Sequence, residues 1–380
     1  MRTRILASSS AVVLASLALH ACDGAQPITL DATVAADASD GAADASVSDG
    51  APQSDVADTR AQTLRYTAGP WMMAAGAERT ADCESWTLHN DEPLYVSVVE
   101  MTATAGMHHS NWFFVPDNNF DGPDGTWRCS SRGFDQGAAA ALGGVFFAQS
   151  TQVTTDAQRF PPGTAFVVPP HARIIGALHQ LNTSSMARSV GLSLTVHTVP
   201  RSTVRTRLSP FYLEYGPLDI APRARSQFDV ECPLEERFRT VTGGPVDLRF
   251  FYGLAHYHEH GLSMRVTVQG GALDGRTLYE TDAREGDSWA RTMDPAVDIS
   301  GATGLKLTCV FDNPGTTSIR YGNGNGEMCI WFGFTDSAYQ WAARAPQSAR
   351  NTRGETRDGT VYNTAPCSDI VALRSRYLNE

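Results

Sequence analysis

Between residue 64 and Cys367 the chain consists of short apolar or alternating runs that Gly, Pro, Asn and Asp interrupt. Typical runs are residues 94–99 (LYVSVV), 190–196 (VGLSLTV) and 305–311 (LKLTCVF). No long segment has helical periodicity, and short strands at this spacing are typical of all-β sandwiches or barrels. A break at residues 199–203 separates two similar stretches. We therefore predict an all-β fold of two tandem antiparallel β-sandwich, jelly-roll-like domains, at residues 62–200 and 201–375.

The N-terminus has a different composition from the rest. Arg2 and Arg4 precede an apolar run that ends at Cys22, which is the pattern of a bacterial export signal. The end of the run resembles the lipobox of lipoproteins, so we predict a signal peptide at residues 1–22 and lipidation of Cys22. His20 is unusual inside such a box, and plain secretion is the alternative.

Residues 23–61 are rich in Ala and Asp, lack aromatic residues and carry only negative charge before Arg60. Such a segment cannot bury enough apolar surface to fold, so we predict a disordered tether. We expect an exported protein, lipid-anchored to a bacterial membrane and facing the periplasm or the cell surface.

Charge narrows the range of partners. The net charge is -11, and no run of Lys or Arg is present. This argues against a nucleic-acid partner. After the N-terminal segment no apolar run reaches membrane-spanning length. We expect a monomer that contacts a membrane only through its anchor and acts on a small-molecule substrate.

Cysteine use agrees with export. Apart from Cys22 the chain has six cysteines and no Cys-x-x-Cys pair, which suits three disulfides in an oxidising compartment. Several connectivities are open for six cysteines. Their order along the chain suggests the pairs Cys83–Cys129, Cys232–Cys367 and Cys309–Cys329.

His256 and His258 follow an apolar and aromatic run. On a strand, residues two apart point to the same face, so these two imidazoles would form half of a transition-metal site. The alternative is one buried, hydrogen-bonded histidine and one surface histidine. Met328 precedes another apolar strand and offers a thioether, a soft ligand that suits Cu(I). Its alternative role is ordinary core packing.

Three further histidines lie in the first half. His108 and His109 begin an aromatic strand, and His179 ends another apolar strand. Neighbours on a regular strand face opposite sides, so His108 and His109 can bind one metal only at a bulge or a strand end.

These residues, in this order, resemble the copper type II, ascorbate-dependent monooxygenases, the family of peptidylglycine α-hydroxylating monooxygenase and dopamine β-monooxygenase. The likeness covers about residues 80–370 and extends to Gly261, to the segment 160–166 and to Cys309 as partner of the cysteine after the methionine. It implies two separate copper sites. One would use His108, His109 and His179 for electron transfer. The other, with His256, His258 and Met328, would meet dioxygen and substrate as the catalytic site.

The resemblance implies a copper-dependent monooxygenase with two coppers per chain, which hydroxylates a C–H bond of a small organic substrate. The co-substrates would be O₂ and a reductant such as ascorbate. The main rival is a copper-binding or copper-storing lipoprotein without catalysis, which would use the same ligands. A third possibility is a carbohydrate- or protein-binding sandwich with degenerate sites.

One departure from the family bears on the substrate. The peptide-amidating members hold a substrate carboxylate with Arg, Asn and Tyr where this chain has Leu254, Ile330 and Phe332. Apolar side chains cannot form the bidentate grip that Arg gives a carboxylate. We therefore hypothesise that this chain is not a peptide amidator and takes an apolar or neutral substrate.

The remaining polar residues near these motifs receive no ligand role. We expect Glu327 to be structural, and Tyr257 and Glu259 to face away from the histidine pair. The other histidines of the body are expected to be structural or on the surface: His89, His171, His197 and His260.

Overall fold

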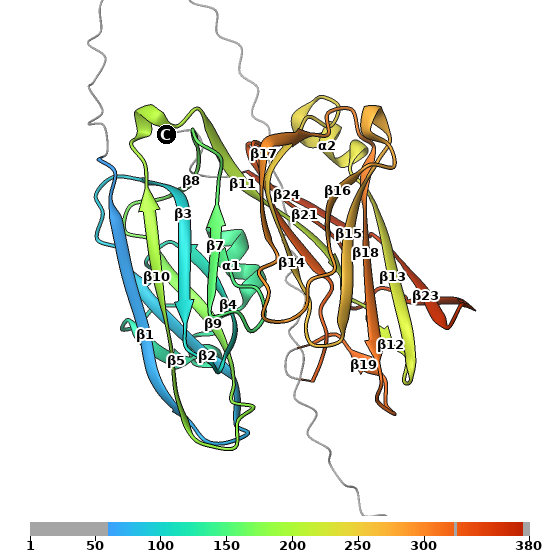
Figure 1. The fold of residues 1–380 in the computed structure, drawn as a ribbon. Coiled ribbons are helices and arrows are strands. Elements are labelled where there is room, and N and C mark those ends of the chain that lie inside the picture. The colour runs from blue at the N-terminus through green and yellow to red at the C-terminus, as the bar shows by residue number, and fades with distance from the viewer. Residues whose placement is uncertain (1–59, 323–324, 375–380) are drawn as a thin grey trace, which may run out of the picture. The chain divides into compact units, whose positions relative to one another are not determined.

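The computed structural model describes residues 60–322 and 325–374 (Figure 1). The predicted signal peptide, its Cys22 and the predicted tether up to residue 59 lie outside the described residues. The described part of the chain belongs to one compact unit and consists mainly of strands. The predicted all-β fold of antiparallel β-sandwiches is confirmed.

A five-stranded antiparallel sheet with the order β5-β2-β9-β4-β6 forms one layer of the first half. Its strand β4, which lies between β9 and β6, is buried along its whole length. The strands are β2 (Glu78–Thr87), β4 (Met107–Val115), β5 (Gly125–Arg128), β6 (Gly144–Ala148) and β9 (Arg173–Leu181).

The second layer of the first half belongs to a larger sheet. Its strand β10 alternates buried and half-buried residues, because one face packs on the core. Tyr66 of this sheet meets Trp112 of β4 edge to face, with ring centroids 6.2 Å apart. The strands are β1 (Thr63–Met73), β3 (Leu94–Ala103), β7 (Thr155–Arg159), β8 (Thr164–Val168) and β10 (Arg188–Thr198).

The larger sheet continues into the second half of the chain. β8 pairs in parallel with β11 (Thr206–Tyr215), and the order then runs β11-β20-β14-β17. β21 also pairs with β11, and β24 pairs with the far side of β21. The predicted domain boundary falls at a 3₁₀ turn (Arg201–Thr203), yet the sheet is continuous across it. The further strands are β14 (Arg249–His256), β17 (Ala290–Asp298), β20 (Ile330–Thr335), β21 (Tyr339–Ala345) and β24 (Asp369–Arg374).

A six-stranded sheet with the order β16-β15-β18-β13-β23-β22 covers the larger sheet in the second half (Figure 1). Trp331 of β20 packs between the layers, with its ring 5.3 Å from Phe250 and 5.9 Å from Tyr279. The strands are β13 (Ala224–Pro233), β15 (Gly261–Gln269), β16 (Thr277–Thr281), β18 (Gly304–Asn313), β22 (Thr352–Arg357) and β23 (Thr360–Pro366).

The smaller elements connect these layers. The Asp135 side chain accepts a hydrogen bond from the Ala138 N–H and caps the first helix. No helix among the described residues is both long and apolar enough to cross a membrane. The elements are a two-stranded ribbon, β12 (Asp219–Ile220) and β19 (Ile319–Arg320), the helices α1 (Gln136–Leu142) and α2 (Glu235–Thr242), and the 3₁₀ turns Cys129–Arg132 and Gly271–Leu273.

All three expected disulfides are present. Cys83 pairs with Cys129, Cys232 with Cys367, and Cys309 with Cys329. Cys232 and Cys367 are 135 residues apart and join β13 to the segment after β23. A cross-link that closes so long a loop stabilises mainly by restricting the unfolded chain.

Replacing both Cys232 and Cys367 by Ser should therefore lower the free energy of unfolding by about 2–5 kcal/mol. Urea unfolding under oxidising conditions measures the effect. Reduction with dithiothreitol should then bring the free energies of unfolding of the wild type and the variant closer together. Equal stability of the two oxidised proteins would contradict the entropic role of this bond.

Candidate metal centre

A β-bulge brings His108 and His109 to the same site. The pairing of β4 with β9 shifts register between Met107 and His109, so the alternation of faces is interrupted at His108. Both rings consequently contact His179, with centroids 4.4 Å away for His108 and 4.9 Å away for His109. The bulge that the adjacent histidines require is confirmed.

His179 lies directly opposite His109 on the neighbouring strand. Its Nε2 is 2.8 Å from the carboxylate of Glu78, which can only accept, so Nε2 carries the proton. Nδ1 is then the bare nitrogen and lies 3.1 Å from Nε2 of His109. Metal bonds of about 2 Å at near-tetrahedral angles place two ligand nitrogens about 3.3 Å apart, so this spacing suits two ligands of one ion.

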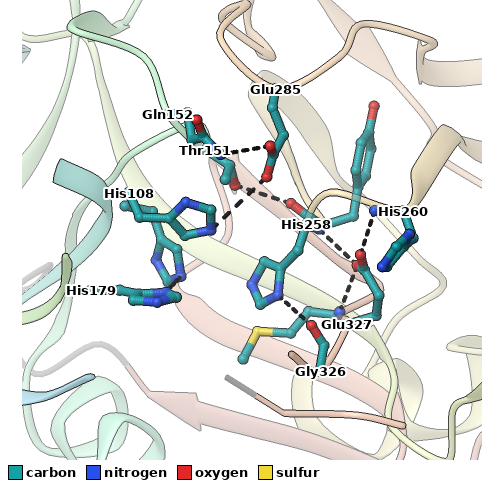
Figure 2. Close-up of polar contacts among 12 residues, drawn as sticks. His108, Thr151, Gln152, His179, His258, His260, Glu285, Gly326 and Glu327 are labelled. Atoms are coloured by element: carbon teal, nitrogen blue, oxygen red, sulfur yellow. Dashed lines mark hydrogen bonds and ion pairs between the residues drawn. The ribbon is translucent and has the colours of Figure 1, made fainter. Parts of the chain in front are cut away.

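The second histidine pair lies where β14 ends. His256 is the last residue of the strand, and His258 lies two residues beyond it, just before the turn at Glu259 and His260. The prediction put both histidines on the strand; the structure places only His256 there, yet their ring centroids are 5.3 Å apart. His258 Nδ1 donates to the Gly326 carbonyl at 2.9 Å (Figure 2). This hydrogen bond fixes the tautomer and leaves Nε2 of His258 bare.

Glu327 joins the backbone of His258, His260 and Met328 in one hydrogen-bonded unit (Figure 2). Its fully buried carboxylate accepts the backbone N–H groups of His258 at 2.8 Å, His260 at 2.7 Å and Met328 at 3.3 Å. Burial raises the pKa of Glu327 to about 8, against the lowering effect of these hydrogen bonds. Met328 is itself buried, and the adjacent Cys329 is tied to Cys309. The expected structural role of Glu327 fits these contacts.

His109 connects the two ligand sets. Its ring centroid lies 4.9 Å from His256 and 5.3 Å from His258, in addition to its contact with His179. Two groups of three histidines can each gather their nitrogens around one point, and His109 belongs to both groups. We call His108, His109, His179, His256 and His258 the five-histidine cluster. The structure thus differs from the expectation of two separate sites, because the two ligand sets are in direct contact.

Burial keeps the cluster neutral. Removal from water, together with the neighbouring His179 and His258 imidazoles, lowers the pKa of His108 to about 3. Removal from water lowers the pKa of His258 to about 4, against the raising effect of its hydrogen bond to the Gly326 carbonyl. Burial and neighbouring imidazoles hold the pKa values of His109 and His256 well below 6.5, and burial lowers that of His179 against the effect of Glu78. Neutral imidazole is the form that binds metals.

Several nitrogens of the cluster are buried without any hydrogen-bond partner among the described residues. They are Nδ1 of His108, Nδ1 of His109, both ring nitrogens of His256 and Nε2 of His258. Each unsatisfied buried polar group costs about 1–3 kcal/mol, and native proteins contain few of them. A bound metal would remove this cost by using the lone pairs. Imidazole ligands suit copper, and the backbone of Met328, whose thioether would suit Cu(I), belongs to the unit that Glu327 holds beside His258.

Sequence reasoning missed Glu285, which lies in the loop of residues 282–289 between β16 and β17. One carboxylate oxygen lies 3.9 Å from His108 Nε2, and the other accepts from Gln152 Nε2 at 2.7 Å (Figure 2). Burial raises the pKa of Glu285 to about 7. Neither its spacing nor its polar surroundings in the sequence distinguish it from a surface acid.

The same loop fastens the two halves together beside the cluster. Gly286 N–H donates to the Thr151 carbonyl at 3.0 Å, and Trp289 N–H donates to the Ser150 hydroxyl at 2.9 Å. The Thr151 hydroxyl in turn donates to the Tyr257 carbonyl at 3.0 Å, between the two ligands of the second pair. These contacts hold the first half against the His256–His258 segment.

The remaining histidines lie outside the cluster. His89 and His171 are exposed, and His197 pairs with Glu100 at 3.1 Å. His260 contributes its backbone N–H to Glu327, and its side chain belongs to neither three-histidine group of the described chain.

Tyr257 packs away from the two histidines that flank it, as expected. Its hydroxyl donates to the Ala283 carbonyl at 2.6 Å and its ring stacks on Trp289 at 4.3 Å. Gly261 makes room for this ring, since a Cβ there would lie 2.0 Å from the Tyr257 ring.

Comparison with known proteins adds little. No family model matches the chain, and neither does any curated protein. Among solved structures it is similar to the crystal structure of the STIV MCP, at 7% identity and a TM-score of 0.31, over 73% of this chain and 95% of that one. It is also similar to the VP2 subviral particle of infectious bursal disease virus, at 10% identity and a TM-score of 0.16, over 75% and 74%. Such low scores carry no argument about function.

The buried histidines predict a specific pH dependence. The unfolded chain binds protons at its histidines below pH 6.5, whereas folded His258 resists protonation until about pH 4. The metal-free protein should therefore lose stability as the pH falls from 7 to 5, by about 2 kcal/mol from this residue alone.

Urea unfolding of the metal-free wild type and of His258→Asn at both pH values isolates this contribution. Asn retains an N–H donor for the Gly326 carbonyl, and the loss between pH 7 and pH 5 should shrink by about 2 kcal/mol in the variant. His89→Asn, at an exposed position, is the control and should leave the pH dependence unchanged. Equal pH dependence in all three proteins would refute the assignment.

Glu327→Gln should disturb the loop of the second pair. Both carboxylate oxygens of Glu327 accept from backbone N–H groups, so whichever way the glutamine amide is turned, its NH₂ group faces a donor. The lost hydrogen bond should cost about 1–3 kcal/mol. We expect lower stability in urea and weaker copper binding. Glu259→Gln, at the exposed acid nearby, should change neither quantity. Identical behaviour of the two variants would show that Glu327 does not organise the loop.

Proposed function

We propose that the chain is a copper-dependent monooxygenase that hydroxylates a C–H bond of a small organic substrate with O₂ and a reductant such as ascorbate. The observation that carries the proposal is the five-histidine cluster, whose members are 0–5% exposed and present unpartnered, neutral nitrogens. The five histidines that resemble the family's copper ligands are the members of this cluster. Export and a lipid anchor at Cys22 belong to the proposal on the strength of the sequence alone.

Bound copper would supply one-electron redox chemistry and reactivity toward O₂. His108, His109, His179, His256, His258 and Met328 are the residues that would hold it. A thioether beside neutral imidazoles favours Cu(I), the form that reacts with O₂. In the net reaction one oxygen atom enters the C–H bond, the other leaves as water with two protons, and the reductant supplies two electrons.

The chain's own residues would orient the metal ligands and exclude water from the site. Glu78 and the Gly326 carbonyl fix the tautomers of His179 and His258, so that each imidazole turns one bare nitrogen toward the cluster. Glu327 fixes the backbone of His258 and Met328. Burial removes water that would compete for the metal and for reactive species.

The surroundings of His256 support a substrate without a carboxylate. Ile330 lies directly opposite His256, and Phe332 lies directly opposite Leu254, on the paired strands β14 and β20. Directly opposite residues share one face of the sheet, as do residues two apart on a strand. An apolar surface therefore adjoins His256. Glu285 adds a negative charge near His108 when it is ionised, which would repel an acidic substrate.

A second candidate function is the storage or transfer of copper without catalysis. It is favoured by the near-complete burial of the cluster, with His256 at 0% exposed and His179 at 3%. Both candidates require the same ligands and differ in whether bound copper reacts with O₂ in a reductant-dependent way.

Oxygen uptake by the purified chain, loaded with copper anaerobically and then supplied with ascorbate and O₂, tests the proposal. We expect uptake that requires both copper and ascorbate and that increases with an apolar substrate. Met328→Ala should lower this rate at least tenfold, because the site loses the ligand that stabilises Cu(I). Met186→Ala, at a methionine that is 70% exposed, is the matched control and should retain the wild-type rate.

Two other outcomes separate the candidates. Stoichiometric copper without ascorbate-dependent uptake would favour storage. Hydroxylation of a glycine-extended peptide at ordinary enzymatic rates would refute the substrate argument that rests on Leu254, Ile330 and Phe332.

A further inference from the structure

Glu285 is a carboxylate of the second half that lies beside a candidate metal ligand of the first half (Figure 2). One of its oxygens, Oε1, is 3.9 Å from Nε2 of His108. Oε1 is buried and has no hydrogen-bond partner among residues 60–322 and 325–374. The other oxygen, Oε2, accepts from the Gln152 side chain at 2.7 Å. Oε1 is therefore an acceptor that the described contacts leave unused, next to an imidazole.

Gln152 connects Glu285 to the backbone of His108. Its N–H donates to the His108 carbonyl, and its side-chain amide donates to Glu285. Gln152 has a φ of 60°, in the left-handed region that residues other than glycine rarely adopt. Such a conformation persists where the surrounding contacts hold it, and it is frequent at functional sites. The two hydrogen bonds of Gln152 thus fix where the Glu285 carboxylate lies relative to His108.

The loop of residues 282–289 is held on both sides of Glu285. Arg284, one residue earlier, donates to the Gly261 carbonyl at 2.9 Å. Gly286, one residue later, donates its N–H to the Thr151 carbonyl at 3.0 Å. The first contact is made within the second half and the other reaches the first half. The backbone that carries Glu285 is therefore fixed beside the cluster by both halves of the chain.

The two nitrogens of His108 have different surroundings. Nε2 lies near Glu285, whereas Nδ1 is buried and without a hydrogen-bond partner in the described part of the chain. A neutral imidazole has one N–H and one lone pair, so an acceptor at Nε2 leaves the lone pair on Nδ1. His179 has this arrangement already, since Glu78 accepts from its Nε2. Metal-binding histidines commonly donate their second nitrogen to a carboxylate.

We propose that Glu285 is a positioning residue for His108: its carboxylate accepts the Nε2 proton and leaves Nδ1 as the nitrogen that binds the metal. The inference rests on the proposed copper function and adds a residue of the second half to the support of the first ligand set. His108 stays neutral and gives one lone pair to one ion. Hydrogen bonds at functional sites are often long before the ligand binds, and a small rotation of the Glu285 side chain closes the remaining distance.

The tautomer of His108 tests the inference in the metal-free chain. ¹⁵N NMR of the histidine-labelled protein distinguishes a protonated ring nitrogen from a bare one. It is recorded at pH 8, above the pKa of about 7 to which burial raises Glu285. The His108 signals are those that disappear in His108→Asn. We expect the proton on Nε2 in the wild type and a shift of the proton toward Nδ1 in Glu285→Leu, which offers no acceptor.

Two controls accompany the variant. Asp287→Asn, at an exposed acid of the same loop, should leave the His108 tautomer unchanged. His258 should keep its proton on Nδ1 in every protein, because the Gly326 carbonyl accepts it. A His108 proton on Nδ1 in the wild type, or an unchanged His108 tautomer in Glu285→Leu, would overturn the role of Glu285. The wild-type measurement decides alone if Glu285→Leu does not fold.

Copper binding separates this inference from the proposed function. Loss of a partner that orients a metal ligand weakens metal binding by about 10–100-fold. Anaerobic titration of Cu(I) against a chelator should show such a loss at one position in Glu285→Leu and none in Asp287→Asn. An unchanged affinity in Glu285→Leu overturns the inference and leaves the copper function standing. A wild type that binds no copper contradicts the proposed function, and the metal-free tautomer still decides whether Glu285 holds the His108 proton.

Discussion

The constraint on which the site depends is the burial of five neutral imidazoles, several of whose nitrogens have no hydrogen-bond partner within residues 60–322 and 325–374. Unsatisfied buried nitrogens oppose folding, and burial of their charged forms would oppose it more strongly. Such an arrangement is retained where the lone pairs have a use, and a metal ion is the partner that accepts several imidazole lone pairs at once. The metal-free cluster therefore opposes folding, and a bound metal would offset that cost.

The irregular backbone features near the cluster, the bulge in β4 and the end of β14, position its histidines. The bulge in β4 turns two adjacent histidines to one side, and the end of β14 presents two more. Glu327 binds the backbone N–H of His258, and the disulfide at Cys329 anchors the start of the strand that follows. The continuous sheet and the Thr151–Gly286 contact then bring the pairs from the two halves together.

Periodicity and composition were enough to predict the all-β fold, the proximity of His256 and His258, and the need for a bulge or a strand end at His108 and His109. The disulfide pairs followed from cysteine order. The contact between His109 and His256 could not be predicted, because it depends on how the 150–152 and 282–289 segments join two halves that are distant in sequence. Glu285 could not be predicted for the same reason, because only the folded loop brings it close to His108.

Diffraction data from crystals of the copper-loaded chain, collected at the copper absorption edge, test the central claim most directly. The account predicts anomalous peaks among the five histidines, with His109 within bonding distance of copper and Met328 beside the second pair. Anomalous peaks elsewhere, or a fully loaded protein in which the five imidazoles make no bond to copper, would contradict it.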